Sequence, residues 1–100
     1  MIKVKIKGKE VIEQITIKGH SGYEESGKDI VCASVSSIVI TSVNAIVRID
    51  NEAIKFDESN GVIIDILKHD EIIDKLILNL IELLEELKIK YSKYIEIRRC

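Results

Sequence analysis

The segment from residue 30 to residue 49, IVCASVSSIVITSVNAIVRI, constrains the fold most, because its composition and its periodicity point to different structures. Its abundance of valine and isoleucine is typical of a β-strand. Its polar residues, however, recur every three or four positions and so share one stripe of a helix: Ser34, Ser37, Thr41, Asn44 and Arg48. We therefore predict a deeply buried helix over about residues 30 to 49, with Asp29 as its N-cap.

Segments on both sides of this helix predict the sheet that it covers. Near the start of the chain, Ile2, Val4 and Ile6 alternate with lysines, which is the pattern of a strand with one buried face. A second apolar run extends from Val11 to Lys18 after a short link that contains glycine. This spacing favours an antiparallel hairpin.

The second half of the chain repeats the same order of elements. Residues 52–56 and 62–67 flank the turn sequence DESNG and predict a second hairpin. Asp70 then caps a long amphipathic helix, and residues 94–97 alternate again as a last short strand. The order ββαββαβ indicates an α+β fold with two helices on a mostly antiparallel sheet.

Composition limits the chain to a single domain, residues 1–100, and excludes several partners. Its 15 Lys and Arg nearly balance 17 Asp and Glu, so the formal net charge of −2 supplies no basic field for direct nucleic-acid binding. The first residues lack the apolar core of a signal peptide, and we expect no apolar stretch to approach the ~20 residues that span a bilayer. We expect a cytoplasmic protein without membrane contact. Two cysteines supply no disulfide framework.

Candidate chemistry gathers where a polar loop meets the predicted helix. The loop over residues 19–29, GHSGYEESGKD, is longer than most connections, and we expect residues 21–28 to be mobile without substrate and to order over a bound peptide. Cys32 lies in the first helical turn, where unpaired N–H groups favour a thiolate. The loop can bring His20 against this thiol, as a base beside its nucleophile. Asp29 and Ser36, one turn before and after, complete a polar edge.

A simpler interpretation stays open for these residues. A small cysteine among valines is commonly core packing, His20 then merely closes a turn, and Asp29 is an ordinary N-cap. His69 and Cys100 complete two His and two Cys, but these four contain no short ligand pair of a zinc site, so we expect no metal and no cofactor. His69 precedes a predicted cap, and we expect Cys100 to be frayed and without a role.

The sequence GHSGYEESGKDIVCASVSS closely resembles the signature of the ribosomal-processing cysteine protease family, often called Prp. In that signature, a Gly-His pair and a loop precede an Asp-Ile-Val-Cys segment, and the family has the same length and order of elements. The motif agrees in residue type and spacing at Gly19, His20, Gly27, Asp29, Cys32 and Ser36. Ser21 replaces a small apolar residue and Ala33-Ser34 replaces Ala-Ala, and neither change removes a reactive group.

The resemblance implies a cysteine endopeptidase that removes a short N-terminal extension from the large-subunit ribosomal protein conventionally numbered twenty-seven, a step of ribosome assembly. Cys32 is then the nucleophile, His20 is the base and later the acid for the leaving amine, and Gly19, Asp29 and Ser36 take supporting positions. The family also implies a homodimer, which the wide apolar face of the second helix accommodates.

A different class of function is a non-catalytic module that binds a ribosomal or other partner. Its binding surface is then the basic N-terminal strand, with Lys3, Lys5, Lys7 and Lys9. Such a row of lysines commonly just solubilises an edge strand. Thiol reactivity separates the two hypotheses, because only the enzyme needs a reactive Cys32.

Overall fold

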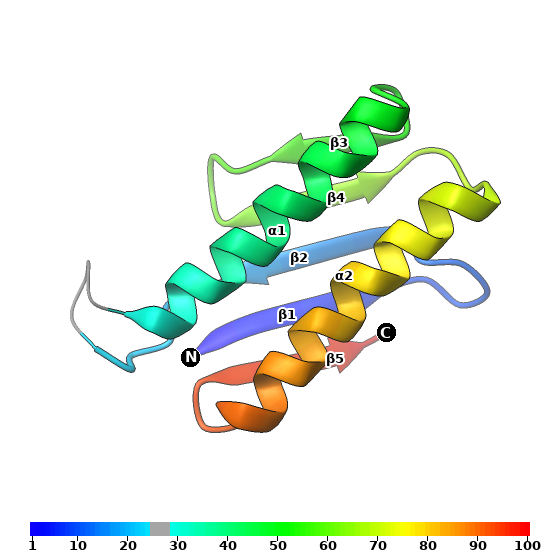
Figure 1. The fold of residues 1–100 in the computed structure, drawn as a ribbon. Coiled ribbons are helices and arrows are strands. Elements are labelled where there is room, and N and C mark those ends of the chain that lie inside the picture. The colour runs from blue at the N-terminus through cyan, green and yellow to red at the C-terminus, as the bar shows by residue number, and fades with distance from the viewer. Residues whose placement is uncertain (25–28) are drawn as a thin grey trace.

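The computed structural model describes residues 1–24 and 29–100, which form one sheet with helices on one of its faces (Figure 1). The predicted α+β class and the order ββαββαβ are confirmed. In this part of the chain the elements are β1 (Ile2–Lys7), β2 (Gln14–Lys18), α1 (Ile30–Ile49), β3 (Ile54–Asp57), β4 (Val62–Ile66), α2 (Glu71–Lys90) and β5 (Ile95–Arg99).

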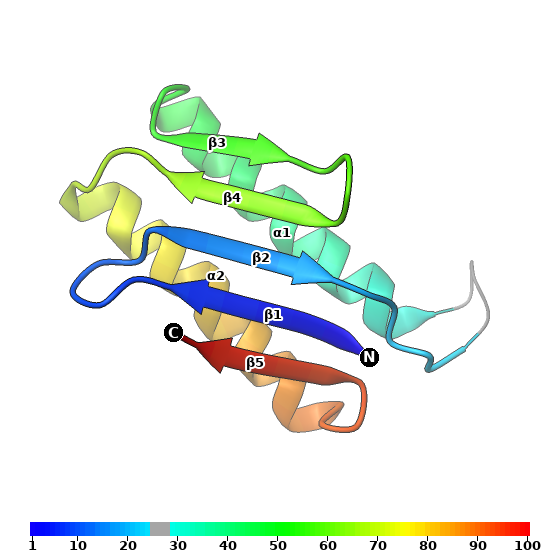
Figure 2. The same ribbon diagram turned by 180° about the vertical axis from the view of Figure 1, so that it is seen from behind.

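The strands of the described residues form one mixed sheet in the order β3-β4-β2-β1-β5 (Figure 2). Both predicted hairpins are antiparallel, β2 and β4 are also antiparallel, and β5 runs parallel to β1. β1 is therefore an interior strand. The prediction that its lysines protect an edge is wrong: Lys3, Lys5 and Lys7 are exposed on a strand that is paired on both sides.

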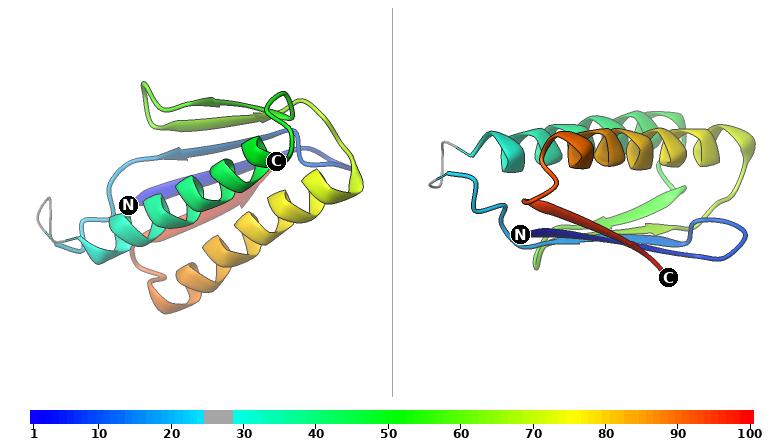
Figure 3. Two further views of the ribbon diagram at one scale, coloured as in Figure 1. Left: turned by 45° about the horizontal axis from the view of Figure 1, so that its top comes forward. Right: turned by 90° about the horizontal axis from the view of Figure 1, so that it is seen from below.

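The core lies between the sheet and a layer in which α1 and α2 run side by side (Figure 3). α1 lies over the β2, β4 and β3 side of the sheet and α2 over the β1 and β5 side. Each helix buries residues at spacings of three or four, as the periodicity predicted. The buried residues are Val31, Val35, Val39, Val43 and Ile46 in α1 and Ile73, Ile77, Leu80, Ile81 and Leu84 in α2.

The prediction that α1 is deeply buried is wrong, because only the face that carries the buried valines and Ile46 lies in the core. Ile30, Ile40, Val47 and Ile49 are exposed by 50%, 52%, 42% and 53%. Among the described residues, α1 is also one helix whose length and apolar composition would suit a membrane span, contrary to our expectation for the sequence. A core helix of a globular protein can have the same length and apolar composition, and α1 covers the sheet in this fold.

Several strands differ at their ends from the prediction: β3 is Ile54–Asp57 rather than residues 52–56, and β4 ends at Ile66 rather than at residue 67. β2 begins at Gln14 rather than at residue 11, because the Glu13 N–H donates to the Lys7 carbonyl at 2.8 Å and closes the preceding link as a loop. β5 extends beyond the predicted strand. The Cys100 N–H donates to the Ile6 carbonyl at 2.9 Å, so the expected fraying of Cys100 is also wrong.

Candidate active site

Asp29 caps α1 and fixes the backbone that carries Cys32. Its Oδ1 accepts the N–H groups of Val31 and Cys32, each at 3.0 Å, which confirms the predicted cap. The Ala33 N–H then donates to the Asp29 carbonyl at 3.1 Å. The N–H groups of Val31, Cys32 and Ala33 are thus satisfied, so the prediction of unpaired N–H groups around Cys32 is wrong at these three positions.

Gly19 places His20 at the end of β2. Its φ of +91° lies in the left-handed region, and a Cβ built there would lie 2.5 Å from the carbonyl oxygen of Met1. Glycine therefore allows the chain to turn closely past the start of β1. This gives the predicted supporting position of Gly19 a physical role: it directs the chain from β2 to the exposed His20.

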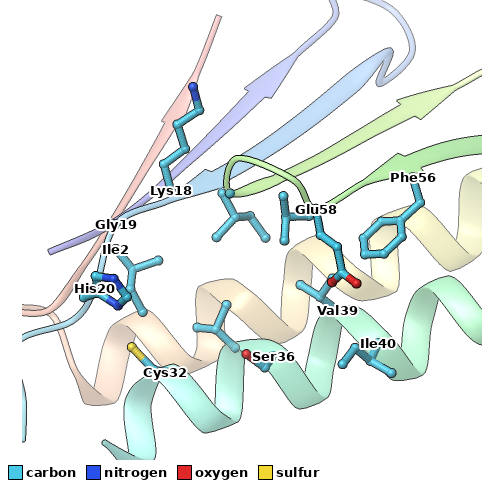
Figure 4. A pocket seen from close by; sticks show the side chains of 14 residues that line it. Ile2, Lys18, Gly19, His20, Cys32, Ser36, Val39, Ile40, Phe56 and Glu58 are labelled. Atoms are coloured by element: carbon cyan, nitrogen blue, oxygen red, sulfur yellow. The ribbon is translucent and has the colours of Figure 1, made fainter. Parts of the chain in front are cut away.

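His20 and Cys32 face one another at one end of a hollow beside α1 (Figure 4). Cys32 is half-buried in the first turn of α1, whereas His20 comes from the loop after β2. The hydrogen bonds between described residues do not include one from the His20 ring to the thiol. A catalytic base and its nucleophile are often farther apart before substrate binds, so this arrangement is compatible with a dyad.

Ser21 connects the His20 loop to α1 through both its main chain and its side chain. Its N–H donates to Cys32 Sγ at 3.4 Å, and its hydroxyl donates to Asp29 Oδ2. The hydroxyl bond is the largest cause that lowers the pKa of Asp29 from 3.8 to about 2, followed by the backbone bond from Cys32. Ser21 is only 4% exposed, and it therefore forms a buried polar link between the two predicted catalytic residues.

Tyr23 extends this link to the turn between α2 and β5. Its N–H donates to the Ser21 hydroxyl at 3.1 Å. Its ring packs edge-on against Tyr91, with ring centroids 5.7 Å apart, and against Tyr94 at 5.1 Å. The loop is thus supported by the turn between α2 and β5. Our prediction that the central loop orders over a peptide also covers residues 25–28, which lie outside the described residues, as does Gly27 of the motif.

Two hollows meet at the candidate dyad. The first, of about 290 Å³, runs along α1 toward the turn between β3 and β4, and its lining is largely apolar, with Val35, Val39, Ile40, Phe56 and Val62 (Figure 4). The second lies on the side of the loop and is lined by Gly22, Glu24, Asp29 and Ala33. His20, Cys32 and Ser36 line both hollows. An extended chain that passed from one hollow to the other would cross the thiol.

Sequence reasoning named five of the candidate-site residues, Gly19 among them, and missed two. Asp29, Cys32 and Ser36 lie on one end of α1 with His20 opposite, as predicted. Ser21 was noted only as a departure from the family motif, and Tyr23 was not singled out within the loop sequence. Ser21 and Tyr23 contact residues that are not related to them by helical or strand periodicity. The departure of Ser21 from the family motif was therefore the available signal in the sequence.

The remaining His and Cys lie away from this site. The His69 Nδ1 is 3.4 Å from Asp74 at the start of α2, and Cys100 follows β5. Among residues 1–24 and 29–100, no group of three or more His, Cys, Asp or Glu side chains is placed to hold a metal ion.

Fold and site together define a class: a small α+β protein that carries a cysteine at a helix start opposite a histidine. The family described as cysteine protease Prp matches residues 1–96, and the chain belongs to this family. It is 36% identical over 52 residues to the ribosomal processing cysteine protease Prp of two Staphylococcus aureus strains. The match covers 50% of this chain and spans about half the length of those relatives, 49%.

Solved structures show the same fold. The S. aureus Prp in complex with a covalently linked product peptide has a TM-score of 0.92 at 24% identity, and both chains are covered completely. The same protease in complex with a substrate peptide has a TM-score of 0.85 at 24% identity, also with complete coverage. The protein SMU.848 from Streptococcus mutans has a TM-score of 0.77 at 25% identity over 99% of this chain and 93% of that one.

Proposed function

We propose that this chain is a cysteine endopeptidase with Cys32 as nucleophile and His20 as general base. The observation that carries the proposal is that both residues line both hollows, so that they flank the path of an extended peptide. Membership of the cysteine protease Prp family supports it. So does the covalently linked product peptide of the S. aureus protease, whose fold this chain shares.

The proposed reaction runs through a thioester. His20 takes the proton of the Cys32 thiol, the resulting thiolate attacks the carbonyl carbon of the scissile bond, and the π electrons of the carbonyl move to its oxygen. When the carbonyl reforms, the C–N bond breaks, and the imidazolium of His20 gives its proton to the leaving amine nitrogen. His20 then takes a proton from water, and the water oxygen attacks the thioester carbon. The C–S bond breaks, the imidazolium returns its proton to the Cys32 thiolate, and the acid product leaves as a carboxylate after losing its proton to solvent.

We propose an unfolded protein terminus as the substrate. The apolar hollow along α1 offers walls for side chains of an extended chain, and it has no room for a folded surface. Terminal extensions are poorly ordered and fit this requirement. The relatives are named ribosomal processing proteases, which supports a ribosomal precursor as the substrate. Within this class, our specific proposal is the N-terminal extension of large-subunit ribosomal protein number twenty-seven.

The experiment that tests this function is mass spectrometry of that precursor after incubation with the protein. We expect wild type to cut once near the N-terminus of the precursor and to leave the mature protein intact. Cys32→Ser should abolish cleavage at an unchanged Tm, because serine is nearly isosteric with cysteine and the side chain at this position is half-exposed. His20→Ala should slow cleavage by about 10²-fold or more, the range for a lost general base. Cys100→Ser is the matched control and should cleave like wild type.

Two outcomes would reject this function. If the precursor stays intact after incubation with wild type, the proposed substrate is wrong. If wild type and Cys32→Ser cleave it equally, the proposed mechanism is wrong. The binding module would then lead, with the exposed lysines of β1 as its surface. The cytoplasmic location and the homodimer expected from the sequence remain proposals, which fractionation and light scattering would test.

A further inference from the structure

We propose that Ser21 is a positioning residue, whose buried hydroxyl holds its own main-chain N–H against the sulfur of Cys32. The inference rests on the proposed function for its effect on cleavage, but not for its effect on the thiol. The need for such a donor follows from the helix cap. The N–H groups of Val31 and Cys32 already donate to Asp29, so the start of α1 does not offer them to a reacting atom.

The Ser21 hydroxyl is fixed from two sides. It donates to Asp29 Oδ2 and accepts the Tyr23 N–H at 3.1 Å. Because Ser21 is 4% exposed, water is a poor substitute for either partner. The main-chain N–H of the same residue is thereby directed at Cys32 Sγ, at a distance of 3.4 Å. Alanine at this position would keep the N–H and lose both side-chain bonds that orient it.

A donor at this place serves two stages of the proposed reaction. Before attack, an N–H directed at sulfur favours the thiolate, because a hydrogen bond to the charged form of a group stabilises that form. After attack, the new negative charge lies on an oxygen one bond from the carbon that sulfur has joined. The same N–H is then a preorganised donor for the oxyanion, which is the kind of contact that lowers an acyl-transfer barrier.

The test compares three variants of the site with a control variant in which a serine of α1 is replaced. Ser21→Ala removes the hydroxyl. Asp29→Asn retains a side-chain oxygen for the cap, but an amide NH2 group replaces the oxygen that accepted the Ser21 hydroxyl. The double variant tests whether the two act as one unit. Ser42→Ala is the control, because its half-buried hydroxyl donates to the Ile38 carbonyl at 2.7 Å within α1. All are made with Cys100→Ser, so that iodoacetamide reports on Cys32.

We expect Ser21→Ala to lower kcat on the precursor peptide about tenfold, the effect of one misplaced hydrogen bond, with KM changed by less than about twofold. The time profile of Cys32 alkylation at neutral pH should slow by about threefold to tenfold, the effect of one lost hydrogen bond to the reacting sulfur. Asp29→Asn should produce the same two changes, and the double variant should be no worse than either single one. Ser42→Ala should leave both readouts unchanged.

Each outcome separates this inference from the proposed function. If wild type and Ser21→Ala share the same kcat and the same alkylation profile, Ser21 does not position the thiol, and the protease proposal is untouched. If wild type cuts no precursor but the alkylation profile still shifts, the protease proposal fails and the positioning role holds. If Ser21→Ala does not fold, the alkylation profile of Asp29→Asn decides, and an unchanged profile there overturns the inference.

Discussion

Replacing Gly19 by alanine tests how far the site depends on the turn that follows β2. Gly19 and Gly22 flank His20 and Ser21, and both have positive φ, +91° and +73°. They differ in their surroundings: a Cβ on Gly19 would lie 2.5 Å from the Met1 carbonyl oxygen, whereas a Cβ on Gly22 would meet nothing within 4 Å. Gly22→Ala is therefore a control for backbone conformation alone.

The two substitutions should differ in magnitude. The left-handed backbone costs an L-residue about 1–2 kcal/mol, which is the full effect expected for Gly22→Ala. Gly19→Ala must in addition displace Met1 and strain the hydrogen bond from the Ile2 N–H to the Tyr94 carbonyl, 2.9 Å, which adds about 0.5–1.5 kcal/mol. At about 4–8 °C per kcal/mol for a domain of this size, Tm should fall by at least about 2 °C more for Gly19→Ala.

Thermal unfolding followed by circular dichroism measures this difference, and peptide cleavage provides the second readout. We expect Gly19→Ala to lose cleavage beyond what its stability explains at a temperature where it is still folded, because His20 is the next residue. Equal Tm losses for the two alanine variants would show that the contact with Met1 does not constrain the turn. If Gly19→Ala cleaves the peptide at the wild-type rate, the position of His20 does not depend on the contact with Met1.

Two further predictions concern charge and the apolar hollow. The lowered pKa of Asp29 contributes stability that is present above its ordinary value of 3.8 and is lost as pH falls toward about 2. The Tm difference between wild type and Asp29→Asn should therefore narrow between pH 4 and pH 2, and a constant difference would contradict the assigned cause. Ile40→Lys places a charge in the hollow on a side chain that is 52% exposed, so peptide KM should rise severalfold at an unchanged Tm. Val47→Lys, exposed on α1 outside the hollow, should leave KM unchanged, and equal KM values for both would exclude the hollow as a peptide site.

Local patterns predicted the bounds and the N-cap of α1, whereas its burial and the long-range contacts were out of reach. The cap at Asp29 and the polar stripe that indicated a helix depend on neighbours within one or two helical turns, so the sequence carries them directly. The exposure of Ile40 and Val47 depends on how much of α1 the sheet can cover, which no helical period reveals. The parallel pairing of β1 with β5 was likewise unpredictable, because it joins the two ends of the chain.

The candidate site divides in the same way. His20 and Cys32 were found through their residue types and the family motif, both of which are readable along the chain. The bond from Ser21 to Asp29 crosses a loop, and the bond from the Ser21 N–H to Cys32 depends on how that loop folds back. The cap also changed the chemistry expected at the helix start, since the Asp29 carboxylate accepts the N–H groups that were expected to favour the Cys32 thiolate.

The aromatic contact of Tyr23 with Tyr91 and Tyr94 has a consequence for the order of folding. The residues of the candidate dyad are synthesised early, but the rings that support their loop belong to the turn that leads into the last strand. Contacts between such distant parts of a chain form slowly, because closing the intervening loop costs entropy first. An incomplete chain therefore carries the thiol without the aromatic support of its loop, and the geometry of the site is completed only when the C-terminal strand joins the sheet beside the first.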